Sequence, residues 1–208
     1  MKKRILLVDD HPVVVLALKI ILEQHGFEVV STTDNGVDAL KLVKDLAPDA
    51  VILDIGIPQL DGLEVIERSK KLPAPPLILV LTAQPSDYFV TRCIQAGASG
   101  YVSKQKDMTE VIHALRAILS GHSYFPIINN GNIYDHSNSN ESELIRKLST
   151  REMAVLQQLA MGLSNKEIAD RMLLSNKTIS TYKTRLLEKL NANNLVDLIE
   201  ITKRNNII

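Results

Sequence analysis

The sequence contains a single cysteine, which excludes a disulfide bond within the chain. Cys93 lies in a mostly apolar stretch with helical spacing, where a buried and unreactive thiol is the expected state. An isolated thiol also fits a reducing compartment.

Long apolar runs are missing as well. Residues 5–8 are apolar, but Asp9 and Asp10 end that run before it reaches the length of a signal-peptide core. Residues 13–22 are interrupted by Lys19 and are too few to span a bilayer. We therefore expect a cytoplasmic protein with no membrane partner.

The chain also has no net charge, because 24 Lys and Arg balance 24 Asp and Glu. The charges are nevertheless unevenly spread. Residues 1–120 hold 13 basic and 15 acidic side chains, residues 121–143 hold no basic and 3 acidic ones, and residues 144–208 hold 11 basic and 6 acidic ones. The net charge of +5 in the last part favours a polyanion as its partner.

The first part of the chain alternates short apolar runs with longer helical patterns. The pattern predicts strands at residues 5–8, 28–31, 50–53, 77–81 and 100–102. It predicts helices at residues 11–25, 36–46, 62–70, 86–96 and 108–120. Five strand–helix repeats indicate an α/β domain at residues 1–121, a doubly wound, flavodoxin-like parallel sheet of five strands with helices on both faces.

The composition then changes. Residues 129–142 are rich in Asn and Ser, and we expect a flexible linker at residues 122–143. An all-α domain of four helices should follow at residues 144–208, with helices at 150–161, 165–172, 176–190 and 194–203. Thr150, Ser164 and Ser175 are placed to cap three of them. The short connection at residues 173–175 is typical of a helix-turn-helix.

Carboxylates follow two of the predicted strands. Asp9 and Asp10 come at the end of the first strand and Asp54 at the end of the third. A strand order of 2-1-3-4-5 would bring these ends together at the carboxyl edge of the sheet. Crowded carboxylates repel one another and favour a hard divalent cation with oxygen ligands. The sequence therefore predicts a Mg²⁺ site.

Two further polar residues end neighbouring strands. Thr82 can donate its hydroxyl to a phosphoryl oxygen, and Lys104 supplies a positive charge. Asp54 can attack phosphorus as a nucleophile, while the metal and Lys104 neutralise the charge of the transferring group. Each residue alone has an ordinary structural explanation, but their coincidence at four strand ends favours a phosphoryl-transfer site.

Four segments resemble a response-regulator receiver domain: Leu6-Leu7-Val8-Asp9-Asp10-His11-Pro12, Val51-Ile52-Leu53-Asp54-Ile55-Gly56-Ile57-Pro58 with Asp61-Gly62, Leu81-Thr82-Ala83, and Lys104. The resemblance implies that Asp54 accepts a phosphoryl group from a sensor histidine kinase. It implies that Asp9 and Asp10 hold Mg²⁺ with the backbone carbonyl of Gly56. It also implies that Thr82 and Tyr101 change position on phosphorylation, with Lys104 bridging to the phosphate.

The chain departs from the receiver pattern at three positions. Gln105 stands where many receivers have proline, so the loop after Lys104 can differ. Gly56 replaces a commonly larger residue and leaves the pocket more open to water. Gln84 occupies the other position that tunes dephosphorylation.

The predicted helix at residues 176–190 has the side chains in the basic C-terminal part that could bind a polyanion. Its apolar stripe consists of Ile179, Tyr182, Leu186, Leu187 and Leu190. The opposite side carries short polar residues between basic ones: Lys177, Ser180, Thr181, Thr184 and Glu188, flanked by Lys183, Arg185 and Lys189. A solvated amphipathic helix would look similar, but the preceding helix-turn unit favours a helix that enters the major groove of DNA.

Several segments here resemble the LuxR-type helix-turn-helix: Leu148-Ser149-Thr150-Arg151-Glu152, Ser164-Asn165-Lys166-Glu167-Ile168-Ala169, Leu174-Ser175, Thr178-Ile179 and Lys189-Leu190. A receiver joined to this domain resembles the NarL/FixJ family, and Gly56 with residues 175–187 narrows the resemblance to the BvgA/EvgA group. The resemblance implies base contacts by Ser180, Thr181 and Thr184. It implies contacts with the DNA backbone by Lys177, Thr178, Lys183 and Arg185.

We therefore expect a DNA-binding transcriptional response regulator of a two-component phosphorelay, activated by phosphorylation of Asp54. Its partners would be an unorthodox sensor histidine kinase, promoter DNA and a second copy of the chain, with dimerisation favoured by phosphorylation. The only reactions that it would catalyse are its own phosphorylation and dephosphorylation.

Two other functions share part of this pattern. A Mg²⁺-dependent hydrolase with an aspartyl-phosphate intermediate would also use Asp54, but it would leave the basic helix unexplained. A DNA-binding regulator that no longer uses phosphate would not need the complete set of pocket residues. A P-loop nucleotide site is excluded, because the sequence lacks a glycine-rich Gly-Lys-Ser/Thr motif.

Overall fold

The computed structural model describes residues 2–83, 87–126, 139–172, 174–205 and 207. The chain forms two compact units, Met1–Asn129 and Asn130–Ile208. Gln84 and most of the expected linker, residues 127–138, lie outside the described residues. No helix in the described part of the chain is long and apolar enough to cross a membrane.

The first unit is a parallel five-stranded sheet between two layers of helices. Its strands are β1 (Arg4–Val8), β2 (Glu28–Thr33), β3 (Ala50–Leu53), β4 (Leu77–Thr82) and β5 (Gly100–Ser103). Its helices are α1 (Pro12–Gln24), α2 (Gly36–Leu46), α3 (Gly62–Lys70), α4 (Asp87–Ala96) and α5 (Met108–Leu119). The strand order is β2-β1-β3-β4-β5, as a flavodoxin-like fold requires, so the predicted fold class is confirmed.

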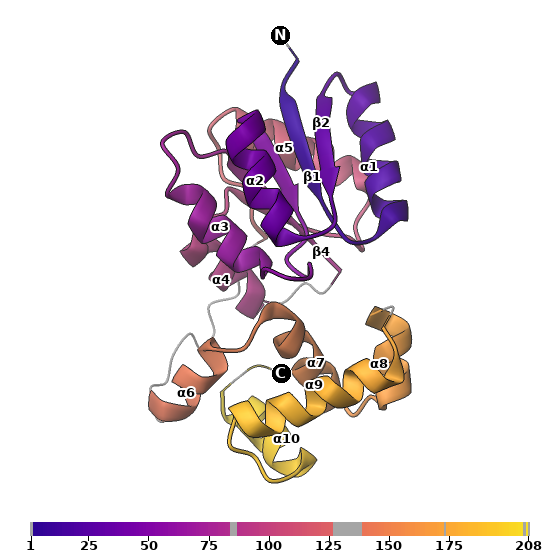
Figure 1. The fold of residues 1–208 in the computed structure, drawn as a ribbon, viewed down its shortest axis with the longest axis vertical. Helices are drawn as coiled ribbons and strands as arrows, with labels where there is room; N and C mark the ends of the chain where they lie inside the picture. Colours follow the sequence, from indigo (N-terminus) through magenta and orange to yellow (C-terminus); the bar gives the residue numbers. More distant parts are fainter. Residues whose placement is uncertain (1, 84–86, 127–138, 173, 206, 208) are drawn as a thin grey trace. The chain divides into compact units, whose positions relative to one another are not determined.

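Burial of β1, β3 and β4 on both faces explains their nearly continuous apolar sequences, whereas the edge strand β2 is more exposed and more polar. Helices α1 and α5 lie next to each other on one face, and α2, α3 and α4 follow one another on the other (Figure 1). Alternate residues of β1 illustrate the two layers: Ile5 and Leu7 belong to the core under α1 and α5, while Leu6 and Val8 are buried outside that cluster.

The free edge of β5 is partly covered by the segment that follows α5. The amide of Tyr101 donates to the carbonyl of Tyr124 at 2.7 Å, and the amide of Tyr124 donates to the carbonyl of Ser99 at 3.1 Å. These bonds satisfy backbone groups that an edge strand would otherwise present to solvent.

The second unit is helical in its described residues. It contains α6 (Ser139–Arg146), α7 (Thr150–Ala160), α8 (Asn165–Met172), α9 (Asn176–Lys189) and α10 (Leu195–Arg204). The predicted four-helix domain was therefore one helix short: α6 is additional and begins inside the expected linker. Glu141 of α6 pairs with Arg204 at 3.1 Å and accepts a hydrogen bond from Asn205 at 3.3 Å, so contacts distant in sequence hold this short polar helix.

Capping side chains set where the helices of this unit begin. Ser149, not Thr150 as predicted, caps α7, and its hydroxyl and amide form a reciprocal capping box with Glu152. Ser164 forms the same arrangement with Glu167 before α8, and Ser175 caps α9. Helices α8 and α9 are joined by only residues 173–175, so they form the predicted helix-turn-helix.

Candidate functional site

The register of the sheet brings the predicted acidic residues together. Val8 pairs with Leu53 across β1 and β3, so Asp9 and Asp54 leave their strands at the same level. The amide of Asp54 donates to the carbonyl of Val8 at 2.8 Å. Asp9 and Asp54 are only 4% and 5% exposed, which means that two carboxylates are held beside each other with little solvent to screen them.

Lys104 joins these two carboxylates. Its ammonium lies 2.6 Å from Oδ2 of Asp9 and 2.8 Å from Oδ2 of Asp54. The backbone amide of Lys104 donates to the carbonyl of Thr82 at 2.7 Å, which fixes the loop after β5 to the end of β4. The structure therefore brings Lys104 to the pocket, as the sequence predicted.

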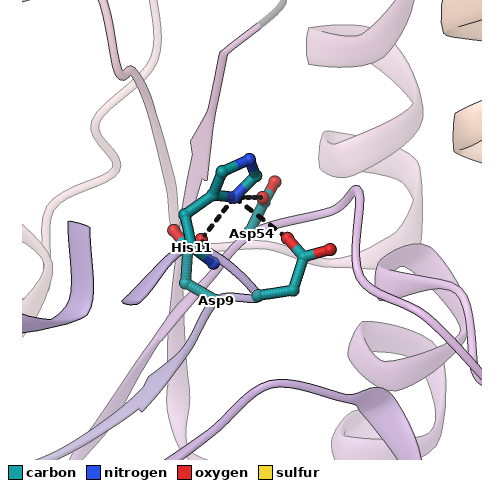
Figure 2. Close-up of side chains that lie close together, drawn as sticks. Asp9, His11 and Asp54 are labelled. Carbon is teal, nitrogen blue, oxygen red and sulfur yellow. Dashed lines mark hydrogen bonds and ion pairs between the residues drawn. The ribbon is translucent and has the colours of Figure 1, made fainter. Parts of the chain in front are cut away.

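His11 also belongs to this cluster, although it is not among the predicted site residues. Its Nδ1 lies 2.9 Å from Oδ1 of Asp9, 3.0 Å from Oδ1 of Asp10 and 3.9 Å from Oδ2 of Asp54. Figure 2 shows the imidazole between the carboxylates. The backbone amide of His11 donates to Oδ1 of Asp9 as well, at 2.9 Å.

Burial and charge shift two pKa values in this pocket. The pKa of Asp9 is raised, first by burial and then by the negative charge of Asp54, and Lys104 offsets these effects only in part. Burial by itself would lower the pKa of Lys104, but Asp54 and Asp9 outweigh it and raise that pKa. Lys104 therefore stays charged at neutral pH.

The donor set fits a hard divalent cation. Carboxylate oxygens of Asp9, Asp10 and Asp54 lie within 4.8 Å of one another, and such oxygens are the ligands that a hard divalent cation prefers. Three carboxylates and the single ammonium of Lys104 leave a charge of about −2, which one divalent cation would balance. The acidic cluster is thus compatible with a metal site.

Gly56 places no side chain beside the carboxylate of Asp54. Its amide donates to Oδ1 of Asp54 at 3.0 Å, and a β-carbon at this position would lie only 3.6 Å from the same oxygen. Any longer side chain at this position would begin beside the carboxylate. Gly62 has a different role, because a β-carbon there would lie 2.5 Å from Cα of Ile55. The backbone of the loop after Asp54 packs against α3 at that point.

Thr82 and Tyr101 lie on one face of the sheet. Val80 pairs with Tyr101 and Thr82 pairs with Ser103, so all four side chains point the same way from their strands. Thr82 and Tyr101 are 5% and 3% exposed. The structure places Thr82 at the carboxyl edge beside the pocket and Tyr101 two residues before the end of β5.

Helix α9 presents a polar face to solvent. Ile179 and Leu186 bury the opposite side. The predicted DNA-contacting residues are exposed or half-buried, with Lys177, Ser180, Thr181, Thr184 and Arg185 exposed and Thr178 and Lys183 half-buried. The hydroxyls of Ser180, Thr181 and Thr184 donate to the backbone carbonyls four residues earlier, at 3.0–3.2 Å.

Lys189 differs from the other basic residues of α9. Its ammonium lies 2.8 Å from Oε2 of Glu152, a carboxylate whose side chain is 5% exposed. Burial opposes ionisation of Glu152, but the bonds from Lys189 and Ser149 outweigh it and lower the pKa of this carboxyl. Lys189 therefore attaches the end of α9 to the start of α7, a contact over 37 residues that helical periodicity does not reveal.

Comparison with known proteins supports this reading of both units. Residues 5–116 match the family described as response regulator receiver domain, and residues 146–202 match that of bacterial regulatory proteins, luxR family. The chain is a LuxR-type response regulator.

Relatives of this response regulator are similar over their whole length. It is 52% identical over 209 residues, covering 100% of both chains, to "Virulence factors putative positive transcription regulator BvgA" of Bordetella pertussis. It is 35% identical, covering 97% of this chain and 98% of the relative, to the DNA-binding transcriptional activator EvgA of Escherichia coli K12. The predicted BvgA/EvgA resemblance is confirmed.

A solved structure of two RcsB dimers bound to two parallel DNAs is 27% identical and covers 98% of each chain, with a TM-score of 0.57. The family to which this response regulator belongs consists of DNA-binding transcription regulators of two-component systems rather than classical enzymes. A receiver domain implies a kinase as a partner, and a LuxR-type domain implies DNA.

Proposed function

We propose that Asp54 is the phosphoacceptor of this response regulator and that its phosphorylation controls DNA binding by α9. The observation that carries this proposal is the geometry of Asp54, a buried carboxylate at a strand end with an ammonium at 2.8 Å and a second buried carboxylate sharing that ammonium. Residues 5–116 match the receiver family, and in a receiver domain this arrangement favours acceptance of a phosphoryl group.

The chemistry is a single transfer. A carboxylate oxygen of Asp54 attacks the phosphorus of a phosphohistidine on the kinase partner, the P–N bond breaks, and the departing imidazole takes up a proton. Lys104 remains charged and balances the phosphoryl oxygens, and the hydroxyl of Thr82 donates to one of them. Asp9, Asp10, Asp54 and the carbonyl of Gly56 would hold Mg²⁺, which would supply further charge neutralisation. The regulator catalyses only this transfer and the later hydrolysis of the aspartyl phosphate, in which water attacks phosphorus, the P–O bond to Asp54 breaks and inorganic phosphate leaves.

We assign the switch to Thr82 and Tyr101. Movement of Thr82 toward the phosphoryl group leaves room on the sheet face that it shares with Tyr101. A receiver surface altered in this way would favour a homodimer and two recognition helices on two half-sites about 10 base pairs apart. The RcsB dimers on DNA support this assembly by analogy, and the BvgA/EvgA relatives favour an unorthodox phosphorelay kinase.

We assign the DNA contacts to the exposed face of α9. Ser180, Thr181 and Thr184 would contact bases, because their short side chains let the helix enter the major groove. Backbone phosphates would be contacted by Lys177, Thr178, Lys183 and Arg185. We propose domain limits of residues 1–121 and 144–208 around a linker at 122–143, and a cytoplasmic location, where the DNA is.

Phosphorylation with acetyl phosphate and Mg²⁺ tests the acceptor. Intact-protein mass spectrometry should detect one added phosphoryl group in the wild type and none in Asp54→Asn. Asp49→Asn is the matched control, since Asp49 precedes the other end of β3 and pairs with Lys3 there. Unchanged labelling of Asp54→Asn would refute the assignment.

Footprinting on genomic fragments tests the output. Protection should strengthen when acetyl phosphate and Mg²⁺ are added to the wild type and should stay unchanged for Asp54→Asn. Equal protection of the wild type in both conditions would contradict control by phosphate.

A further inference from the structure

His11 occupies a position in the pocket that a bound cation would also need. A divalent cation shared by three carboxylates must lie close to an oxygen of each, at about 2.0–2.6 Å. Nδ1 of His11 lies 2.9, 3.0 and 3.9 Å from oxygens of Asp9, Asp10 and Asp54, and Figure 2 shows it beside Asp9 and Asp54. An imidazole nitrogen and a metal ion cannot both fill this space.

The imidazole is held by bonds that metal binding would have to break. Nδ1 forms a hydrogen bond with Oδ1 of Asp9 and lies 3.0 Å from Oδ1 of Asp10, and the backbone amide of the same residue also donates to Asp9. A carboxylate that accepts these bonds is already partly satisfied. It gains less from a metal ion than a carboxylate without them.

The ring has room to leave. The side chain of His11 is 32% exposed, unlike the nearly buried side chain of Asp9. His11 precedes α1 as its N-cap residue, and its side chain makes no capping bond to the helix. Rotation of the ring toward solvent therefore costs the contacts with the carboxylates and leaves the start of α1 intact.

We propose that His11 is an internal competitor for the metal site of this response regulator: its imidazole and a divalent cation exclude each other between Asp9, Asp10 and Asp54. The inference rests on the proposed function, because it takes these carboxylates to be the metal ligands. His11 is then a positioning residue that lowers the affinity for Mg²⁺ and supports the arrangement of the carboxylates until the cation arrives.

Removing the ring should strengthen metal binding. His11→Ala should bind Mg²⁺ about threefold to tenfold more tightly than the wild type, the change expected when roughly one net hydrogen bond no longer has to be broken. The affinity is measured by isothermal titration calorimetry on the full chain after treatment with EDTA. His11→Ser should change it in the same direction, and serine is a favoured N-cap residue that protects against loss of α1.

Thermal unfolding provides a second readout. With EDTA, His11→Ala should unfold at a lower temperature than the wild type, because Asp9 loses its hydrogen bond with the ring. With saturating Mg²⁺ this deficit should shrink or reverse. His25→Ala is the control, since the ring of His25 bonds to the carbonyl of Ile21 at the far end of α1 and should leave the affinity unchanged.

The outcomes separate the two claims. Equal or weaker Mg²⁺ binding by both His11 variants, with normal binding by the wild type, overturns the competitor role and leaves the metal site standing. No Mg²⁺ binding by any of the proteins overturns the proposed metal site and the competitor role together.

Discussion

The pocket of the receiver unit and the exposed face of α9 use charge in opposite ways. In the pocket, Asp9 and Asp54 are almost fully buried and share the ammonium of Lys104. On α9, Lys177 and Arg185 project into solvent. One site holds a few charges in fixed geometry, and the other offers a charged surface.

This difference predicts different consequences of mutation. Buried charges are costly to separate from their partners, so changes in the pocket should alter folding stability and chemistry together. Exposed charges contribute little to stability, so changes on α9 should alter the affinity for DNA and its dependence on salt while the fold persists. Each of the following substitutions probes one side of this contrast.

The largest effect should come from the loop that carries Asp54. Gly62→Ala places a β-carbon 2.5 Å from Cα of Ile55 and 3.0 Å from the carbonyl of Asp54, so backbone must move. We expect the free energy of unfolding of the receiver unit to fall by about 3 kcal/mol, with loss of labelling by acetyl phosphate. Chemical denaturation followed by circular dichroism measures the first effect.

Gly56→Ala is the matched control in the same loop. A β-carbon at Gly56 meets only the carboxylate of Asp54, at 3.6 Å, which is an ordinary contact. Stability should change by less than about 1 kcal/mol, while phosphorylation and dephosphorylation slow because the carboxylate is partly covered. Equal destabilisation by the two substitutions would show that Gly62 is not needed for close packing.

The second largest effect should be on the affinity of α9 for DNA, and it should separate phosphate contacts from base contacts. Lys183→Ala or Arg185→Ala should weaken binding to every duplex and reduce the salt slope of the affinity by about 1. Thr184→Ala should cost about 1–3 kcal/mol on the preferred sequence and little on random DNA. Fluorescence anisotropy over a range of salt concentrations distinguishes them, and an unchanged slope for Lys183→Ala and Arg185→Ala would remove both from the phosphate contacts.

The sequence could predict that the pocket residues lie together, because strand ends in a parallel sheet are positioned by topology. Once the order β2-β1-β3-β4-β5 is assumed, Asp9 and Asp54 must meet, and no long-range information is needed. His11 was missed because its role depends on a rotamer: the ring turns back from the start of α1 toward three carboxylates. Residue type and spacing do not encode that direction.

The additional helix α6 was missed for a different reason. Its sequence, SNESELIR, has the polar composition of a linker and only two apolar residues. Burial of Ile145 and the bonds of Glu141 to Arg204 and Asn205 stabilise it, and these partners lie about 60 residues away. Tertiary contacts therefore override a weak local preference.

Lys189 lies on α9, but its substitution should change folding stability, as substitutions in the pocket do, rather than DNA binding. Lys189→Met removes the ion pair with Glu152, and we expect the free energy of unfolding of the DNA-binding unit to fall by about 1 kcal/mol, since the lysine is partly exposed. The salt slope of DNA binding should stay unchanged, in contrast to Lys183→Ala. A reduced slope with unchanged stability would instead place Lys189 among the phosphate contacts.

The effect of Lys189→Met should depend on pH. The pKa of Glu152 is lowered in the folded chain, so the stability that its charge contributes is present above its ordinary value of 4.5 and is lost as the pH falls through the lowered value. The difference between the wild type and Lys189→Met should therefore narrow at acid pH. Thermal unfolding of both proteins between neutral pH and pH values below 4.5 measures it.

The smallest effect should be a gain in stability, not a loss, and it concerns Asp9. The pKa of Asp9 is raised, mainly by burial and by the charge of Asp54, so its ionised form costs stability at neutral pH. Asp9→Asn removes that cost at the expense of one contact with Lys104, which keeps Asp54 as a partner. In EDTA at neutral pH, we expect the receiver unit of the variant to be more stable by about 1 kcal/mol.

The gain in stability of Asp9→Asn should vanish as the pH falls below 3.8, where the carboxyl of Asp9 is protonated in both the folded and the unfolded chain. Lower stability of Asp9→Asn at neutral pH would mean that the ion pair with Lys104 outweighs the repulsion between the carboxylates, and the pocket would then store no electrostatic strain for a cation to relieve.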